Sequence, residues 1–184
     1  MIPVRLLGLV GSLRRASHNR ALVAAVGECL PADATLEIFD GLGDLPLFNT
    51  DITPEPEAAT RLKAAIAGAD GLVVASPEYN YTVTGVMKNA IDWATRPAKT
   101  SPLRGKPIGL VSASQGMSGG MRAQYHLRQI FVYTDSPVLS QPEVLIPRSH
   151  ERFDADLRLV DESTRDLLLR FGAALVTWVR RFRA

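Results

Sequence analysis

The sequence predicts an α/β protein with a three-layer, doubly wound sheet, in which helices cover both faces of five parallel strands. Short apolar runs alternate with helical patterns about five times along the chain. Two of these runs, 4–10 and 71–75, are apolar nearly throughout, which is typical of strands buried on both faces. A chain of 184 residues with 46% hydrophobic content can bury one sizeable core. We therefore expect residues 1–184 to form a single domain.

The first strand and the first helix are the clearest elements of the amino-terminal half. Residues 4–10 are apolar except for Arg5, and Gly11 ends the run. Apolar residues then recur at helical spacing over 20–30, until Pro31 stops the pattern. The sequence therefore predicts a buried strand followed by a helix.

The next segment is less regular. Residues 35–39 alternate between apolar and polar, which predicts a short strand near an edge of the sheet. Residues 40–56 are rich in Gly, Asp and Pro and are predicted to form a loop. Its apolar residues, Leu45, Leu47 and Phe48, are expected to cover a crevice or a partner subunit. A second helix is predicted over 57–67, with Leu62, Ala65 and Ile66 facing inward.

The carboxyl-terminal half continues the alternation. The predicted elements are a strand over 71–75, a helix over 86–95, a strand over 108–112 and a helix over 121–133. An extended segment follows over 138–146, where Pro142 argues against a central strand. The last helix, over about 161–182, has acidic and basic ends that suit its dipole. Its apolar face consists of Leu168, Phe171, Leu175, Trp178 and Phe182.

Composition excludes several classes of function. The net charge is only +2, and no basic run is long enough to follow a nucleic-acid backbone. The single cysteine, Cys29, rules out an internal disulfide framework and is expected to pack in the first helix. No apolar stretch approaches the roughly 20 residues that cross a bilayer, and the first residues lack the pattern of a signal peptide. We expect a cytoplasmic protein that does not insert into membranes.

A polar loop, GSLRRASHNR over 11–20, joins the first strand to the first helix. Unpaired amides at a helix amino terminus, hydroxyls and arginines suit a phosphate group. The candidate ligands are Ser12, Ser17, Asn19 and the arginines of the loop. Alternatively, Ser17 or Asn19 simply caps the helix. The loop lacks both the G-x-x-x-x-G-K-[ST] and the G-x-G-x-x-G patterns, so a monophosphate fits better than a pyrophosphate.

Two further loops follow predicted strands. SPEYNY, over 76–81, contains aromatic rings suited to a flat ligand, although its tyrosines are equally suited to ordinary packing. A flexible loop, ASQGMSGG, follows the strand over 108–112. Because loops at the carboxyl ends of parallel strands converge, we expect one shared crevice. The three histidines have no spacing that indicates a triad or a metal site, and we expect them to be solvated.

Three stretches, GSLRRASHNR, SPEYNYTVTGVMKNAIDW and GGMRAQYHLRQI, resemble the NADPH-dependent FMN reductase family. The resemblance is to its flavodoxin-like bacterial quinone, azo-dye and chromate reductases, and it extends from the first strand to about Glu143. It implies a flavodoxin-like sheet holding one non-covalent FMN. By resemblance, Ser12, Arg14, Ser17 and Asn19 match the phosphate loop. Pro77, Glu78, Tyr79 and Asn80 match the segment along the isoalloxazine ring. Ser112, Ala113, Ser114 and Gly116 fall in the loop at its far edge.

The resemblance also implies the activity. NADPH or NADH would pass hydride to FMN, which would then reduce a quinone or a similar small acceptor, such as a flavin, an azo compound or a metal oxyanion. The cofactor carries this chemistry, so no catalytic acid or base is assigned. Related proteins form homodimers or homotetramers, which would place Arg122, Tyr125 and Glu143 at a subunit contact. Two alternatives remain: an FMN-binding electron carrier without its own NAD(P)H reaction, and a phosphate-binding protein without flavin.

Overall fold

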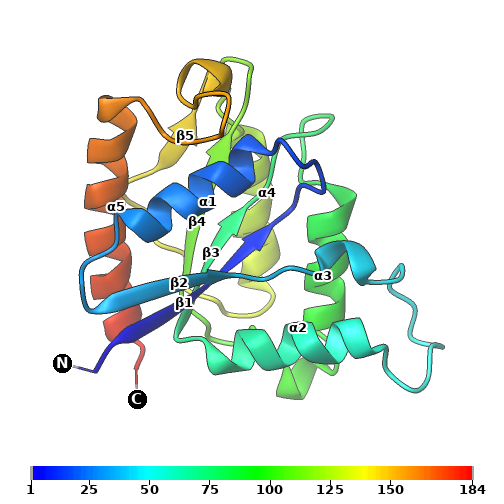
Figure 1. Ribbon diagram of the computed structural model, residues 1–184. Coiled ribbons are helices and arrows are strands. Elements are labelled where there is room, and N and C mark those ends of the chain that lie inside the picture. The colour runs from blue at the N-terminus through cyan, green and yellow to red at the C-terminus, as the bar shows by residue number, and fades with distance from the viewer. Residues whose placement is uncertain (1, 184) are drawn as a thin grey trace.

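The computed structural model describes residues 2–183 and contains one parallel sheet of five strands in the order β2-β1-β3-β4-β5. Helices α1 and α5 cover one face of the sheet, and α2, α3 and α4 cover the other (Figure 1). The strands are β1 (Val4–Val10), β2 (Ala34–Ile38), β3 (Gly71–Ala75), β4 (Ile108–Ala113) and β5 (Val144–Ile146). This flavodoxin-like arrangement confirms the predicted fold class.

The helices begin close to their predicted positions because polar side chains cap several of them. They are α1 (His18–Glu28), α2 (Glu57–Gly68), α3 (Gly85–Ala94), α4 (Met121–Val132) and α5 (Glu162–Arg180). Ser17, Thr84 and Asp161 each accept a hydrogen bond from a backbone N–H in the first turn of the helix that follows. Such caps fix the residue at which a helix starts. Short 3₁₀ helices occur at Leu42–Asp44, Ala98–Thr100 and Ser149–Glu151.

The sheet separates two hydrophobic cores. Leu6 and Val10 on β1 pack toward α1 and α5, whereas Leu7 and Leu9 pack toward α2 and α3. Every residue of β3 and β4 is buried, as expected for central strands covered on both sides. The two edges are short strands, β2 and β5, which confirms the expected edge position of residues 35–39. Within residues 2–183, no helix combines the length and apolarity needed to cross a bilayer.

Two sequence expectations about apolar side chains need correction. Phe48 packs edge to face on Trp93 with ring centroids 5.1 Å apart, and Leu45 is buried, so both cover α3 instead of a crevice. Leu47 is 84% exposed, and the alternative that this segment covers a partner subunit stays a prediction. Phe182 is 46% exposed because α5 ends at Arg180, and its side chain leaves the buried face. Cys29 is buried, as predicted.

Candidate functional site

Three loops meet at the carboxyl edge of the central strands. Val10 pairs with Ala75, and Ala75 pairs with Val111, so the loops that follow β1, β3 and β4 leave the sheet side by side. A cavity of 200 Å³, here called the three-loop cavity, lies among them. Of the residues predicted from the sequence, it is lined by Ser12, Arg14, Ser17, Asn19, Pro77, Glu78, Tyr79, Ala113 and Ser114. The structure therefore brings most of the predicted residues together.

The first loop is fixed to its neighbours at Gly11. Its N–H donates to the carbonyl of Ala75 at 2.8 Å, and its own carbonyl accepts from Thr84 Oγ1 at 2.7 Å. A Cβ at this position would lie 2.8 Å from Thr84 Oγ1 and 2.9 Å from Met87 Cβ. Glycine is therefore required for the close approach of the loop to the start of α3.

The first loop then leaves a series of donors without protein partners. Within residues 2–183, the backbone N–H groups of 12–16 donate to no protein acceptor, and the Arg14 guanidinium forms no ion pair. Ser17 accepts from the N–H of Arg20 at 3.2 Å, so the capping alternative is correct for this residue. The Ser17 hydroxyl hydrogen remains available as a donor. This donor set at the amino terminus of α1 fits a phosphate group.

Asn19 joins the first helix to the end of β4. Its side-chain amide donates to the carbonyl of Ala113 at 2.8 Å, and its carbonyl oxygen accepts from the Ala113 N–H at 3.1 Å. Asn19 is buried, so these two bonds replace bonds that the polar groups would otherwise make with water. The side chain therefore aligns the first loop with the third, while it also lines the cavity.

The second loop turns sharply at Asn80 and Tyr81. Tyr79 and Thr82 exchange two backbone hydrogen bonds of 3.0 Å, and the two residues between them have φ angles of 49° and 66°. Left-handed backbone suits Asn but is costly for Tyr. The Arg122 guanidinium lies 4.3 Å from the centre of the Tyr81 ring and holds it against α4. Asn80, at the tip of the turn, does not line the cavity.

Glu78 connects the second loop to the third. Its side chain is only 8% exposed and accepts from Ser118 Oγ in the third loop at 3.3 Å. It also accepts from Arg122 of α4, at 2.8 Å from Nη1 and at 3.1 Å from the backbone N–H. Helix α4 begins at Met121, and its N-cap residue, Gly120, has a left-handed φ of 87° and no side chain that could cap the helix. A Cβ on Gly120 would lie 2.6 Å from Ser112 Cβ. Glu78 therefore caps α4 from a different segment of the chain.

The other two predicted residues of the third loop lie outside the cavity. Ser112 is fully buried, and its Oγ donates to the carbonyl of Gly119 at 2.6 Å while accepting from Gln124 Nε2 at 2.9 Å. Gly116 donates its N–H to Ser114 Oγ at 3.1 Å. These contacts fix the conformation of the third loop. Ser112 therefore acts on the cavity only through this loop and does not line it.

Three lining residues were missed from the sequence: His18, Gln115 and Ser149. His18 Nδ1 and Ser149 Oγ are 2.7 Å apart, and the imidazole stacks on Phe153 with centroids separated by 5.6 Å. The expectation that His18 is solvated is therefore wrong. Burial lowers the pKa of His18, and the charges of Arg14 and His150 lower it further. The position of His18 inside the first loop motif was the signal that sequence reasoning could have used.

Comparisons with known proteins agree with this geometry. The family model described as NADPH-dependent FMN reductase matches residues 4–151, which include all five strands and all three loops. An NAD(P)H-dependent FMN reductase of Pseudomonas aeruginosa is 43% identical over 182 residues, covering 98% of this chain and 97% of its own. A 2-hydroxy-1,4-benzoquinone reductase of a Burkholderia species is 42% identical, covering 94% of each chain.

A solved structure also matches closely. The flavoenzyme NAD(P)H:(acceptor) oxidoreductase of Paracoccus denitrificans superposes with a TM-score of 0.89 at 34% identity. The match covers 97% of this chain and 98% of that one. The fold, the three-loop cavity and these matches together establish that the chain belongs to the NADPH-dependent FMN reductase family.

Proposed function

We propose that this protein is an NAD(P)H-dependent oxidoreductase whose FMN binds in the three-loop cavity. The proposal rests mainly on the run of N–H groups over 12–16 that have no acceptor within residues 2–183. This run includes Arg14 and directly precedes the amino terminus of α1. Membership of the FMN reductase family supports the same cofactor and an electron donor of the nicotinamide class. The electron-carrier alternative is not favoured, because the relatives are named as reductases.

The first and second loops have separate roles in holding the cofactor. The first loop and Arg14 would bind the phosphate, while Pro77 and Tyr79 would lie along the isoalloxazine ring. Typical ligand pockets have volumes of roughly 300–1,000 Å³. At 200 Å³ this cavity is smaller, which favours a cofactor that keeps part of its ring uncovered for nicotinamide and acceptor.

The residues of the chain bind and position the cofactor. Bound FMN would supply the redox chemistry by accepting a hydride equivalent from NAD(P)H and giving two electrons to an acceptor. Asn19 and Glu78 would act as positioning residues, because Asn19 bonds to Ala113 and Glu78 bonds to Ser118, so each joins its own loop to the third loop. No acid or base needs to be assigned among the lining residues. Quinone reductases among the relatives support a quinone or a similar small molecule as acceptor.

We also propose a homodimer or homotetramer of single-domain chains in the cytoplasm. The support for assembly is a group of exposed side chains on and near α4, consisting of Tyr81, Tyr125, Val132 and Tyr133. Glu143, expected at a subunit contact, is 3.9 Å from Arg128 within the same chain. Sedimentation velocity measures the assembly directly, and a monomer at micromolar concentration would contradict the proposal.

The reductase activity is tested by anaerobic absorbance. Protein reconstituted with FMN is mixed with NADPH or NADH, and bleaching of the visible flavin absorbance is followed by reoxidation with a benzoquinone. We expect bleaching with at least one nicotinamide and recovery with the quinone. A flavin-loaded protein that neither nicotinamide bleaches would be an electron carrier instead.

The assignment of the phosphate loop is tested separately with Arg14→Ala. Loss of a charge-assisted bond to the phosphate should weaken FMN binding about tenfold or more, as measured by fluorescence titration. The matched control is Arg104→Ala, which removes an exposed arginine that does not line the three-loop cavity. Equal affinities for the two variants would remove Arg14 from the phosphate site.

A further inference from the structure

The opposite edge of the sheet contains a second cavity. It has a volume of 640 Å³, lies where β1 begins and α5 ends, and is here called the amino-edge cavity. Its polar lining residues are Arg5, Asp70, Lys106 and Arg183, and Ile2 and Phe182 are among its apolar ones. Arg5 lies near the start of β1 and Gly11 directly follows its end, so this cavity is roughly 20 Å from the three-loop cavity at about 3.3 Å per residue.

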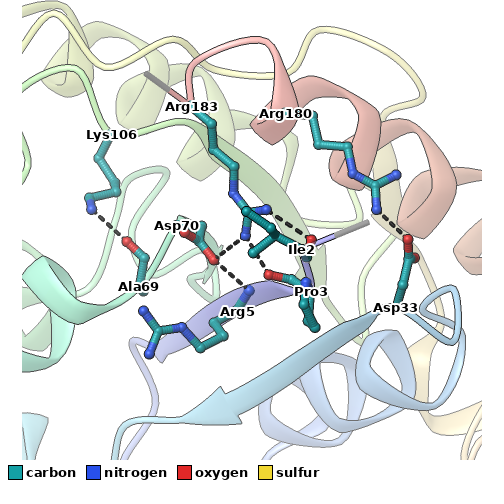
Figure 2. Close-up of polar contacts among 9 residues, drawn as sticks. All are labelled: Ile2, Pro3, Arg5, Asp33, Ala69, Asp70, Lys106, Arg180 and Arg183. Carbon is teal, nitrogen blue, oxygen red and sulfur yellow. Dashed lines mark hydrogen bonds and ion pairs between the residues drawn. The ribbon is translucent and has the colours of Figure 1, made fainter.

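The charges in the amino-edge cavity do not balance. Among the described residues that line it, three cations face one carboxylate, Asp70, which already accepts from Arg183 Nη2 at 2.6 Å and from the Arg5 backbone N–H at 2.7 Å (Figure 2). Arg183 also donates to the carbonyls of Ile2 and Pro3. Asp70 and Arg183 therefore neutralise each other, and within residues 2–183 no second carboxylate pairs with the side chains of Arg5 and Lys106.

Arg5 and Lys106 retain donors that the protein does not use. Within residues 2–183, the Arg5 guanidinium makes no hydrogen bond or ion pair, and the Lys106 ammonium makes one hydrogen bond, to the Ala69 carbonyl at 2.6 Å. The two side chains lie on either side of Ala69 (Figure 2). Since an ammonium has three N–H donors, two of them remain available on Lys106. Two separate cations therefore offer free donors to one cavity.

We propose that the amino-edge cavity binds a small organic phosphate monoester, at a site distinct from the flavin site. The Arg5 guanidinium and the Lys106 ammonium would donate to the phosphate oxygens, and Ile2 and Phe182 would contact the organic body. A phosphate monoester carries close to two negative charges at neutral pH and so matches two cations, whereas a carboxylate matches only one. Burial lowers the pKa of Lys106, although Asp70 opposes the shift, and a bound anion would favour the charged ammonium.

Calorimetric titration with phenyl phosphate tests the site. FMN-loaded protein is used so that the three-loop cavity is filled, and low ionic strength is used because salt screens such contacts. We expect one saturable site in the unchanged protein and at least tenfold weaker binding in Arg5→Gln and in Lys106→Met. Arg5→Gln leaves the backbone bond to Asp70 in place. The matched control, Lys99→Gln, removes an exposed cation outside both cavities and should bind as the unchanged protein does.

Amide NMR shifts provide a second measurement that does not depend on the variants. Phenyl phosphate should move the amide signals of Ala69 and Asp70 and leave those of residues 12–16 unchanged. Absence of saturable binding would overturn the proposal, as would equal weakening in Lys99→Gln or displacement of the ligand by excess FMN. Binding of benzoate as tightly as phenyl phosphate would overturn the choice of a phosphate monoester. Because none of these readouts is reductase activity, failure here leaves the proposed function unaffected.

Discussion

The two edges of the same sheet are held together by different kinds of contact. At the carboxyl edge, buried side chains bridge segments that are far apart in sequence, as Asn19 does with Ala113 and Glu78 with Arg122. At the amino edge, partly exposed ion pairs attach the end of the chain to the start of the sheet. Arg180 pairs with Asp33 there, and Arg183 pairs with Asp70 (Figure 2).

This difference indicates which contacts control the site. A buried polar group that loses its partner keeps its full desolvation cost, whereas water replaces the partner of an exposed charge. Contacts at the carboxyl edge should therefore govern both stability and cofactor binding. Contacts at the amino edge should have a small effect on stability and none on FMN affinity.

The largest effect is expected for Asn19→Ala. The substitution leaves the N–H and the carbonyl of Ala113 without partners in a buried position, so the free energy of unfolding should fall by about 2–3 kcal/mol. FMN affinity should fall as well, because the first and third loops lose their alignment. Urea unfolding and FMN titration measure the two effects.

The control for this prediction is Asn49→Ala. Asn49 is exposed, and within residues 2–183 its side chain accepts only a local hydrogen bond, from the N–H of Asp51 at 2.9 Å. Its loss should change the free energy of unfolding by no more than about 0.5 kcal/mol. A comparable loss in the two variants would remove the distinction between buried bridges and exposed contacts.

Glu78→Gln should have a smaller effect at the same edge. The change keeps the shape of the side chain but removes the charge that pairs with Arg122, whose own side chain is 42% exposed. We expect a loss of about 1 kcal/mol in the free energy of unfolding and a severalfold weaker FMN complex. Unchanged flavin affinity would show that Glu78 does not position the cofactor loops.

The matched control is Asp92→Asn, which removes the exposed pair between Lys88 and Asp92 on α3. Pairs of this kind contribute about 0.3–0.5 kcal/mol. FMN affinity should be unaffected in this control. Asp92→Asn removes only a charge, whereas Glu78→Gln also disturbs the alignment of the loops, so the comparison separates the two effects.

Asp33→Asn tests the amino edge. Asp33 and Arg180 are both about one-third exposed, at 32% and 30%, so the pair should contribute less than about 1 kcal/mol. Raising the salt concentration should reduce even this effect. Chemical unfolding and FMN titration are again the measurements, and any clear change in FMN affinity would contradict the proposed separation of the two edges.

The smallest expected effect is the uptake of a fraction of a proton by His18 when FMN binds. Its pKa in the folded chain is below the ordinary 6.5, so the unfolded chain binds this proton more readily. The contribution of His18 to stability is therefore complete above about pH 6.5 and declines as the pH falls below that value. A phosphate bound beside the imidazole should raise its pKa, so FMN binding near pH 6 should take up protons.

Calorimetry in two buffers of different ionisation enthalpy measures this uptake. His18→Gln should lower the proton uptake. The control, His126→Gln, should not lower it, because His126 contacts Thr82 and does not line the three-loop cavity. The phosphate of FMN also titrates near this pH and contributes equally in both variants. The contribution of His18 is therefore the difference in proton uptake between them. Identical proton uptake in the two variants would show that His18 is not the group that takes up the proton.

The sequence by itself determined the fold and the position of the three loops. Apolar runs over 4–10 and 71–75 and the stop at Pro31 are local patterns, and they predicted strands and a helix that the structure contains. The loop motifs also predicted which stretches line one cavity, because carboxyl ends of parallel strands meet at one edge. Both conclusions depend on residues close together in the chain.

Only the tertiary structure decided what individual side chains do. His18 meets Ser149 across 131 positions, and Asn19 meets Ala113 across 94, so no local pattern could assign those contacts. Asn80 and Ser112 were predicted by motif to touch the cofactor, yet neither lines the cavity. Asn80 lies at the tip of a tight turn, and Ser112 is buried under the third loop. Periodicity determines which face of an element is buried, but the partner of a polar side chain depends on how distant segments pack.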